Sequence, residues 1–343
     1  MQADLYEICS DPLGNGTNSQ VYKIKEKNHP HSVLIAKIYE NRRRKFYERE
    51  KKILLKISGS NDVEINDYLI HIKNANANLE PSNQFQADSA LLTFDFLIHG
   101  NVLDYISLKT LGKPISETYT KFLCYKLLLG LKKIHQNNIS HNKIDIRNVM
   151  FDSNFNPIII HFGDAIISDN HQNDFFGLGM ILAGLLSSKN IISYKFNKKL
   201  NKYFFRFYST NNHFHESSCE EAVFWRILES NKNISISKNF LNFFHILVSP
   251  DKISNIDDLL NNEWLNDIKL CQNEIEINFR EEFKNNYILI SQSKKLINKL
   301  SNTVNNLNGI IDTNEINESI SSKSLVDEFP QIKNGFLKII KNN

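Results

Sequence analysis

The stretch that decides the fold covers residues 139–150 and reads Ile139-Ser140-His141-Asn142-Lys143-Ile144-Asp145-Ile146-Arg147-Asn148-Val149-Met150. It follows Tyr119–Gln136, a run that is apolar on most sides and therefore predicts a buried helix. Three isoleucines then precede His161-Phe162-Gly163. A polar segment that contains His141, Lys143 and Asp145 thus lies between two apolar ones.

The chain before this stretch is predicted to be mostly strands. Residues 4 to about 98 contain alternating or apolar runs at Tyr22–Ile24, Val33–Tyr39, Tyr68–Ile72 and Ala90–Phe96. The segment Asn41–Ile57 is charged on one side and repeats Phe46, Ile53, Leu54 and Ile57 at helical spacing. We therefore expect it to form the single helix of this part of the chain.

The chain after residue 100 is predicted to be mostly helical. Further expected helices are Phe175–Leu186, Glu220–Glu229, Ser237–Val248 and Ile256–Leu260. The composition becomes more polar beyond Trp264, and helical stretches are expected at residues 274–284 and 296–307, before a Ser/Asn-rich segment near 314–323.

Composition limits the function classes. The 343 residues are 41% hydrophobic with a net charge of only +3, which excludes the strongly basic profile of a dedicated nucleic-acid binder. The first ten residues lack a basic start followed by an apolar stretch, so we expect no signal peptide. The most apolar run, Gly177–Leu186, is shorter than the roughly 20 residues that span a bilayer. We expect no membrane or nucleic-acid partner.

The cysteines and histidines favour no metal site. The four cysteines form no CxxC pair, which is typical of reduced thiols, so we expect a cytoplasmic location with the nucleus as the alternative. His213, His215 and Cys219 lie close together in the sequence, but no second ligand cluster accompanies them. We interpret them as loop residues.

Several motifs resemble those of protein kinases. Leu13–Val21 resembles the glycine-rich loop, with Gly14, Gly16 and Val21 in place and Ser19 where the third glycine belongs. Lys37 resembles the strand lysine that holds nucleotide phosphates and pairs with a helix glutamate. Glu50 is the expected partner, with Glu48 as the runner-up.

The nucleotide cleft that this resemblance implies is altered. The segment Ala90–Leu97 resembles the fifth strand and hinge, which makes Phe94 the gatekeeper, places Asp95 at the start of the hinge and adds Leu97 to the cleft. Ile35 replaces the usual alanine two positions before Lys37, on the same strand face. We expect its bulk to narrow the space for the base.

The opening stretch resembles the kinase catalytic loop, H-R-D-L-x-x-x-N. His141 and Asn148 match, but Lys143 replaces the aspartate that accepts the substrate proton. Asp145 takes the place of the phosphate-binding lysine, where it would repel the γ-phosphate. We expect a Lys143–Asp145 pair that maintains the fold of the loop.

The metal-binding motif also differs. His161-Phe162-Gly163 resembles D-F-G with histidine in place of the magnesium-binding aspartate. Magnesium prefers oxygen ligands, and Asn148 alone is a poor site. Asp164 follows the glycine, and we expect it to point elsewhere. No metal is expected.

A deletion follows. Asp174 resembles the aspartate that braces the catalytic loop from the next helix, yet only 174 − 163 = 11 positions separate it from Gly163. An activation loop, a peptide-docking loop and the A-P-E motif do not fit into that distance. Ile253 occupies the position of the arginine that pairs with the A-P-E glutamate, so both members of that pair are missing. Two later segments resemble helices of calmodulin-dependent-type kinases. The G helix is resembled by Glu221–Trp225, and the closing helix by Asn262–Leu265.

The resemblance covers residues 4–268 and implies a bilobal α+β protein kinase-like fold. It predicts a small β-rich N-lobe (4–98) with one αC helix, a larger helical C-lobe (99–268) with a shortened activation segment, and a C-terminal extension (269–343) that is helical or a small α/β module. Leu54, His141 and Phe162 would form the internal column that aligns the lobes.

The implied function is that of a pseudokinase. We expect a protein-binding scaffold or allosteric regulator with protein partners and no cofactor; the alternatives are metal-independent ATP binding and an ATP-binding serine/threonine kinase with atypical or residual transfer. The basic run Arg42–Lys45 is either a partner surface or a solvated helix end.

Overall fold

The computed structural model describes residues 5–15, 18–59, 68–77, 88–109, 115–187, 191–197, 202–208, 214–217, 236–249, 255–269, 273–282 and 284. The chain divides into two compact units, Met1–Glu281 and Glu282–Asn343. Several predictions lie outside the described residues: Gly16, His213, Cys219, the helix Glu220–Glu229 with its Glu221–Trp225 motif, Ile253, and the segments 296–307 and 314–323.

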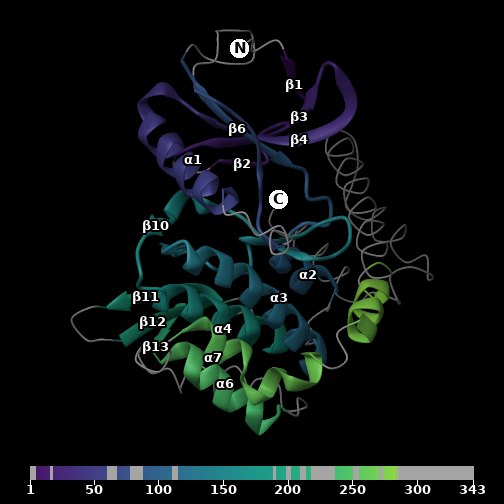
Figure 1. The fold of residues 1–343 in the computed structure, drawn as a ribbon, viewed down its shortest axis with the longest axis vertical. Coiled ribbons are helices and arrows are strands. Elements are labelled where there is room, and N and C mark those ends of the chain that lie inside the picture. Colours follow the sequence, from purple (N-terminus) through teal and green to yellow (C-terminus); the bar gives the residue numbers. More distant parts are fainter. Residues whose placement is uncertain are drawn as a thin grey trace, which may run out of the picture. The chain divides into compact units, whose positions relative to one another are not determined.

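The first lobe is an antiparallel sheet (Figure 1). Its strands are β1 (Tyr6–Ile8), β2 (Gly14–Asn15), β3 (Gln20–Glu26), β4 (His29–Tyr39), β5 (Ile72–Asn76) and β6 (Ala90–Asp95). They run in the order β1-β3-β4-β6-β5, and β2 pairs with β3. Alternate residues such as Ile24, Leu34 and Ala36 are buried on one face, which explains the predicted pattern.

One predicted strand is displaced. The run Tyr68–Ile72 was expected to be a strand, but β5 begins only at Ile72. Leu69 instead bridges Ile159 in the other lobe, and the backbone N–H of Ile70 donates to the Ile159 carbonyl at 3.0 Å. A contact distant in sequence therefore takes the place of the sheet ladder here.

The single helix of this lobe is α1 (Arg44–Ser58), after a short 3-10 turn at Asn41–Arg43. Its buried residues are Tyr47, Glu50, Ile53, Leu54 and Ile57. Phe46, which was expected in this face, is half-buried, whereas its neighbour Tyr47 is fully buried. Glu50 lies in the buried face because it has charged and polar partners there, described below.

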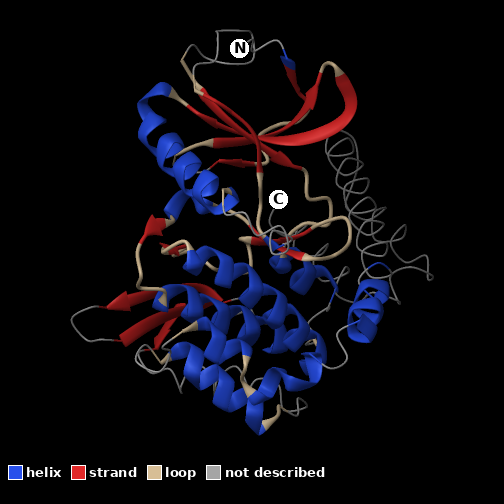
Figure 2. Cartoon of the chain, viewed as in Figure 1, coloured by secondary structure: helices blue, strands red, loops and turns tan. Residues whose placement is uncertain are grey.

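The second lobe is mainly helical (Figure 2). Its helices are α2 (Val102–Lys109), α3 (Glu117–Gln136), α4 (Gln172–Ser187), α6 (Lys238–Val248) and α7 (Ile256–Leu260). Ser116 and Ser237 start α3 and α6, because each side chain accepts a backbone N–H of the first turn. The predicted helices in α3, α4, α6 and α7 are confirmed.

A small sheet in this lobe was not predicted. Strands β11 (Ile191–Asn197), β12 (Lys202–Tyr208) and β13 (Phe214–Ser217) form it in that order, all antiparallel. The β12 segment is rich in Phe and Tyr, residues that favour strands. His215 lies on β13, so its interpretation as a loop residue was wrong.

The compact unit extends beyond residue 268. Residues 273–282 are helical, and Phe279 is fully buried with its ring 5.0 Å from that of Phe122 on α3. Glu276 forms an ion pair with the buried Lys126 of α3 at 3.0 Å. The start of the expected extension is thus part of the same core. Among the described residues, no helix is both long and apolar enough to cross a membrane.

Candidate functional site

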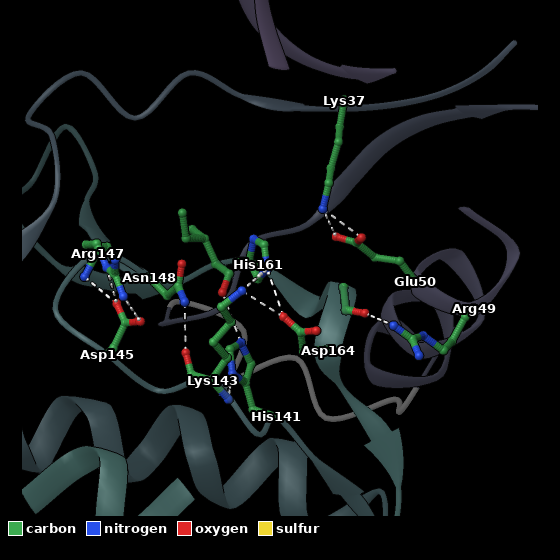
Figure 3. Close-up of polar contacts among 12 residues, drawn as sticks. Lys37, Arg49, Glu50, His141, Lys143, Asp145, Arg147, Asn148, His161 and Asp164 are labelled. Atoms are coloured by element: carbon green, nitrogen blue, oxygen red, sulfur yellow. Dashed lines mark hydrogen bonds and ion pairs between the residues drawn. The ribbon is translucent and has the colours of Figure 1, made fainter. Parts of the chain in front are cut away.

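The structure brings Lys37 of β4 and Glu50 of α1 together (Figure 3). Lys37 Nζ lies 2.8 and 2.7 Å from the two Glu50 carboxylate oxygens, and Tyr39 donates its hydroxyl to Glu50 at 2.6 Å. Glu50 is 2% exposed, so these three bonds compensate for its burial. The runner-up Glu48 is exposed and pairs with Arg44 instead.

The other residues predicted for a nucleotide cleft surround this pair in the sheet. Gly14 and Val21 are directly opposite each other on β2 and β3. Asp95 ends β6 and pairs with Lys73 at 3.0 Å, and Leu97 is buried beyond it. Ile35 lies opposite Phe94 across β4 and β6, so their side chains are neighbours on one face. That these residues hold a nucleotide stays a prediction.

Asp174 braces the polar loop, as the sequence predicts. One carboxylate oxygen accepts the backbone N–H of His141 at 2.8 Å and the other accepts that of Asn142 at 2.7 Å. His135 lies 3.0 Å from the first oxygen. Burial alone would raise the pKa of Asp174, but the hydrogen bonds that it accepts from His135 and from the His141 backbone help to hold that pKa below its usual value.

His141 connects the loop to the internal column. It is fully buried, its Nε2 lies 2.9 Å from the Ile160 carbonyl, and its ring meets Phe162 edge to face at 4.8 Å. Burial lowers its pKa, which favours the neutral ring. Leu54 of α1 is also buried. Of the expected column of Leu54, His141 and Phe162, all three members are buried, and the contact between His141 and Phe162 is present.

Lys143 does not pair with Asp145, so that prediction was wrong. Its ammonium lies 2.9 Å from Asp164 Oδ2 and 3.2 Å from His161 Nε2. Asp145 turns the other way, where it accepts the backbone N–H of Arg147 at 2.7 Å and the guanidinium at 3.1 Å. The local turn after Asp145 satisfies its carboxylate, and Lys143 is left to pair across the site.

Asp164 points into the site, contrary to the expectation that it would point elsewhere. His161 has a left-handed backbone (φ 69°), and Phe162–Asp164 form a 3-10 turn directly after it. This turn folds Asp164 back, so that its Oδ2 lies 3.2 Å from His161 Nε2. Lys143, His161 and Asp164 therefore form one cluster (Figure 3).

The electrostatics of this cluster differ from those of a magnesium site. Burial and then the charges of Lys37 and Lys143 lower the pKa of His161 to about 4. Burial would raise the pKa of Asp164, but the Lys143 hydrogen bond lowers it, so the carboxylate is ionised. The ligand set thus combines one carboxylate and a neutral imidazole with an ammonium in contact with both.

Asn148 stabilises the loop, but its side chain does not make the site a good one for magnesium. Its amide nitrogen donates to the Lys143 carbonyl at 2.9 Å, which fixes the loop backbone. Magnesium demands several oxygen ligands in near-octahedral geometry. A dication here would have one carboxylate, that of Asp164, and would meet the ammonium of Lys143. The residues present do not fit Mg²⁺.

Most of the short segment from Gly163 to Asp174 is held by regular structure or by backbone hydrogen bonds. Arg49 of α1 donates to the Gly163 carbonyl, β10 (Ile166–Ile167) pairs with β7 (Ile139–Ser140), and the N–H of Ser168 donates to the Asn138 carbonyl. Helix α4 then begins at residue 172. Only residues 168–171 lie between β10 and α4, which leaves no room in this segment for a loop that holds a peptide substrate.

Comparisons with known proteins agree with this fold. The family model of the protein kinase domain matches residues 8–175. The chain is 26% identical over 181 residues to serine/threonine-protein kinase mig-15 of Caenorhabditis elegans, a match that covers 51% of this chain and 16% of that protein. It is 24% identical over 167 residues to meiosis-specific serine/threonine-protein kinase mek1 of Schizosaccharomyces pombe, with 47% and 34% covered.

A third relative is misshapen-like kinase 1 of Rattus norvegicus, 25% identical over 180 residues, with 51% of this chain and 13% of that protein covered. The chain therefore spans between 13% and 34% of the length of these relatives. The fold is a bilobal α+β protein kinase-like fold. The matches and the fold together support membership of the protein kinase-like superfamily.

Proposed function

We propose that this chain is a pseudokinase, a protein kinase-like domain that binds protein partners as a scaffold or allosteric regulator and does not transfer phosphate. The observation that carries the proposal is the ammonium of Lys143, which contacts both His161 and Asp164. By the resemblance to kinases, Lys143 occupies the position of the general base and His161 that of a magnesium ligand. The ammonium therefore lies where an active kinase would need a proton acceptor and a metal ion.

Phosphoryl transfer depends on positioning and charge neutralisation, and both are impaired here. The ammonium of Lys143 cannot take the proton of a substrate hydroxyl, and a missing general base commonly lowers the rate about 10²–10⁴-fold. The charge of Asp145 opposes a phosphate, and the Gly163–Asp174 segment supplies no docking loop. These losses act together.

The same structure supports a scaffold. Glu50 is held by Lys37 and Tyr39, and Arg49 on the same helix binds the Gly163 carbonyl. These contacts join α1 to the turn after His161 through residues of the chain itself. Such contacts favour one arrangement of the two lobes, and a preorganised surface suits recognition by a protein partner.

Metal-independent ATP binding is the second candidate. It is favoured by the retained Lys37 and by a second cation, Lys143, on the other side of the turn at Gly163. Two ammonium groups could neutralise part of a triphosphate charge without Mg²⁺. Residual kinase activity has no comparable observation in its favour.

Thermal unfolding with ATP tests both candidates. We expect no stabilisation that depends on Mg²⁺ and no transfer of the γ-phosphate to generic protein substrates. Because ligand stabilisation grows as RT ln(1 + [L]/Kd), excess ATP reveals even weak binding. Stabilisation by ATP with chelator present would support the second candidate. A large rise in melting temperature only with Mg²⁺, or robust phosphorylation, would overturn the pseudokinase proposal.

A further inference from the structure

A pocket of about 510 Å³ lies away from the Lys143 cluster. It is lined by the last turns of α3, by residues 169–172 before and at the start of α4, and by Asn255–Asp257 at the start of α7. Helices α3, α4 and α7 lie together in the lower part of Figure 1. Two histidines, His135 and His171, form part of its wall.

The hydrogen bonds of His135 define its tautomer. Its Nε2 lies 3.0 Å from the ionised carboxylate of Asp174, which can only accept, so the ring proton is on Nε2. Nδ1 then carries a lone pair. This atom is buried and has no hydrogen-bond partner among the described residues. A buried acceptor without a partner in a pocket wall is a candidate for a ligand.

The same reasoning applies to His171. Ser140 Oγ lies 2.7 Å from the Asn170 carbonyl, to which it donates its hydroxyl proton. At 3.0 Å from His171 Nδ1, the hydroxyl oxygen therefore accepts that N–H. Nε2 of His171 is left as the second acceptor.

We propose that His135 and His171 bind a divalent transition-metal ion, Zn²⁺ above all, in this pocket. The three side chains are close neighbours, because one ring nitrogen of His135, one of His171 and a carboxylate oxygen of Asp174 all lie within 4.8 Å of one another. Neutral imidazoles suit zinc, and metal-bound histidines characteristically donate their other N–H to a carboxylate or another oxygen. Asp174 and Ser140 supply those two oxygens.

The rest of the pocket suits an added dication. Its charged lining groups are Lys132, Asp169 and Asp257, and Lys132 already pairs with Asp257 at 2.6 Å. Carboxylates thus outnumber ammonium groups on the wall, which favours a cation. The opening of the pocket leaves room for water as the remaining ligands.

Binding requires one local movement. The two imidazole rings stack with centroids 3.8 Å apart and an interplanar angle of 8°, so their in-plane lone pairs lie in two nearly parallel planes. A shared ion needs these lone pairs to converge, which requires His171 to tilt away from His135. His171 is half-buried and precedes α4, whereas His135 is fixed within α3 by Asp174.

The test compares the full chain with His171→Phe. Phenylalanine keeps a ring to stack on His135 but offers no nitrogen, and His29→Gln is the control because His29 is an exposed histidine outside the pocket. Co²⁺ serves as a spectroscopic probe, and Zn²⁺ binding is measured by titration calorimetry and thermal unfolding. We expect one equivalent bound by the wild type and by His29→Gln, and affinity at least about tenfold weaker in His171→Phe.

Melting without metal shows whether His171→Phe is folded. If it melts with the wild type yet binds Zn²⁺ equally well, the metal lies elsewhere, for example near His215, and the proposal is wrong. Absence of binding by the wild type in excess Zn²⁺ would also overturn it. If His171→Phe is unstable, His171→Gln replaces it with the same expected loss.

Discussion

Lys143 and Asp164 form an ion pair, with 2.9 Å between Nζ and Oδ2, although they are 21 residues apart in the sequence. The pair joins the polar loop to the turn after His161, and its ammonium also contacts the imidazole. A half-exposed cation of the chain itself thus lies between the two motifs that depart most from the kinase pattern. The pKa of His161 should therefore depend on the charge of Lys143.

Lys143→Met tests this dependence. The charge of Lys143 is one cause of the low pKa of His161, so its removal should raise that pKa from about 4 toward the ordinary histidine value. NMR titration of the His161 ring in wild type and variant measures the change. An unaltered titration would show that Lys143 does not approach the ring in solution.

Lys37→Met tests the buried pair with Glu50. Because Glu50 is 2% exposed, loss of its cation should lower the free energy of unfolding by about 1–3 kcal/mol. Urea unfolding measures this. The double variant Lys37→Met with Glu50→Gln is the control and should be more stable than Lys37→Met alone, since no carboxylate is then stranded. An equal loss of unfolding free energy in the single and the double variant would mean that lost packing of the Lys37 side chain, and not a stranded carboxylate, causes the effect.

Stability should also fall on acidification. His161 and His171 both have pKa values lowered from 6.5 to about 4, so the unfolded chain binds protons more readily than the folded one. Their contribution is fully present above about pH 6.5 and is lost as the pH falls through this window toward 4. Urea unfolding of wild type and His161→Gln at several pH values measures it, and the variant should show a shallower decline. Parallel curves would contradict the assignment to His161.

Much of the fold follows from local patterns. The apolar periodicity predicted α3 and α4, and the motif order placed Lys37, Glu50 and Asp174 where the structure has them. Hydrophobic burial determines the helices, because their apolar faces must leave water. A buried charge must have a partner, which determines the positions of Lys37, Glu50 and Asp174.

The partners within the site could not be predicted in the same way. Sequence proximity favoured Asp145 as the partner of Lys143, yet the left-handed backbone of His161 brings Asp164 closer. An aspartate three positions after His161 was the available clue. The β11–β13 sheet was not predicted, although the Phe- and Tyr-rich run at Lys202–Tyr208 has strand propensity.

Phe279→Ala tests whether the helical residues 273–282 belong to the core. Phe279 is fully buried and its ring lies 5.0 Å from that of Phe122, so truncation should cost about 3–5 kcal/mol of unfolding free energy. Ile277, which is 59% exposed on the same helix, provides the control Ile277→Ala, with little expected loss. Urea unfolding compares the two. Equal stability would place this helix outside the cooperative unit.

The last prediction separates a kinase silenced by point substitutions from a remodelled scaffold. The triple variant Lys143→Asp, Asp145→Lys and His161→Asp restores the charges of the kinase pattern. With Asp164 folded back beside residue 161, it should gain a pair of carboxylates and with them measurable Mg²⁺-dependent ATP binding.

We nevertheless expect no transfer to a peptide. The chain between Gly163 and Asp174 forms the 3-10 turn, β10, a short link of residues 168–171 and the start of α4, so this segment offers no loop to position a substrate hydroxyl near the γ-phosphate. That positioning accounts for several kcal/mol of the barrier, of the order of 7–11 in well-oriented reactions. Calorimetry with Mg-ATP and a radiolabelled transfer assay on the same preparation measure the two steps separately. Binding without transfer identifies the shortened segment as the deeper cause of inactivity. Robust peptide phosphorylation would show instead that the substitutions alone had silenced the enzyme.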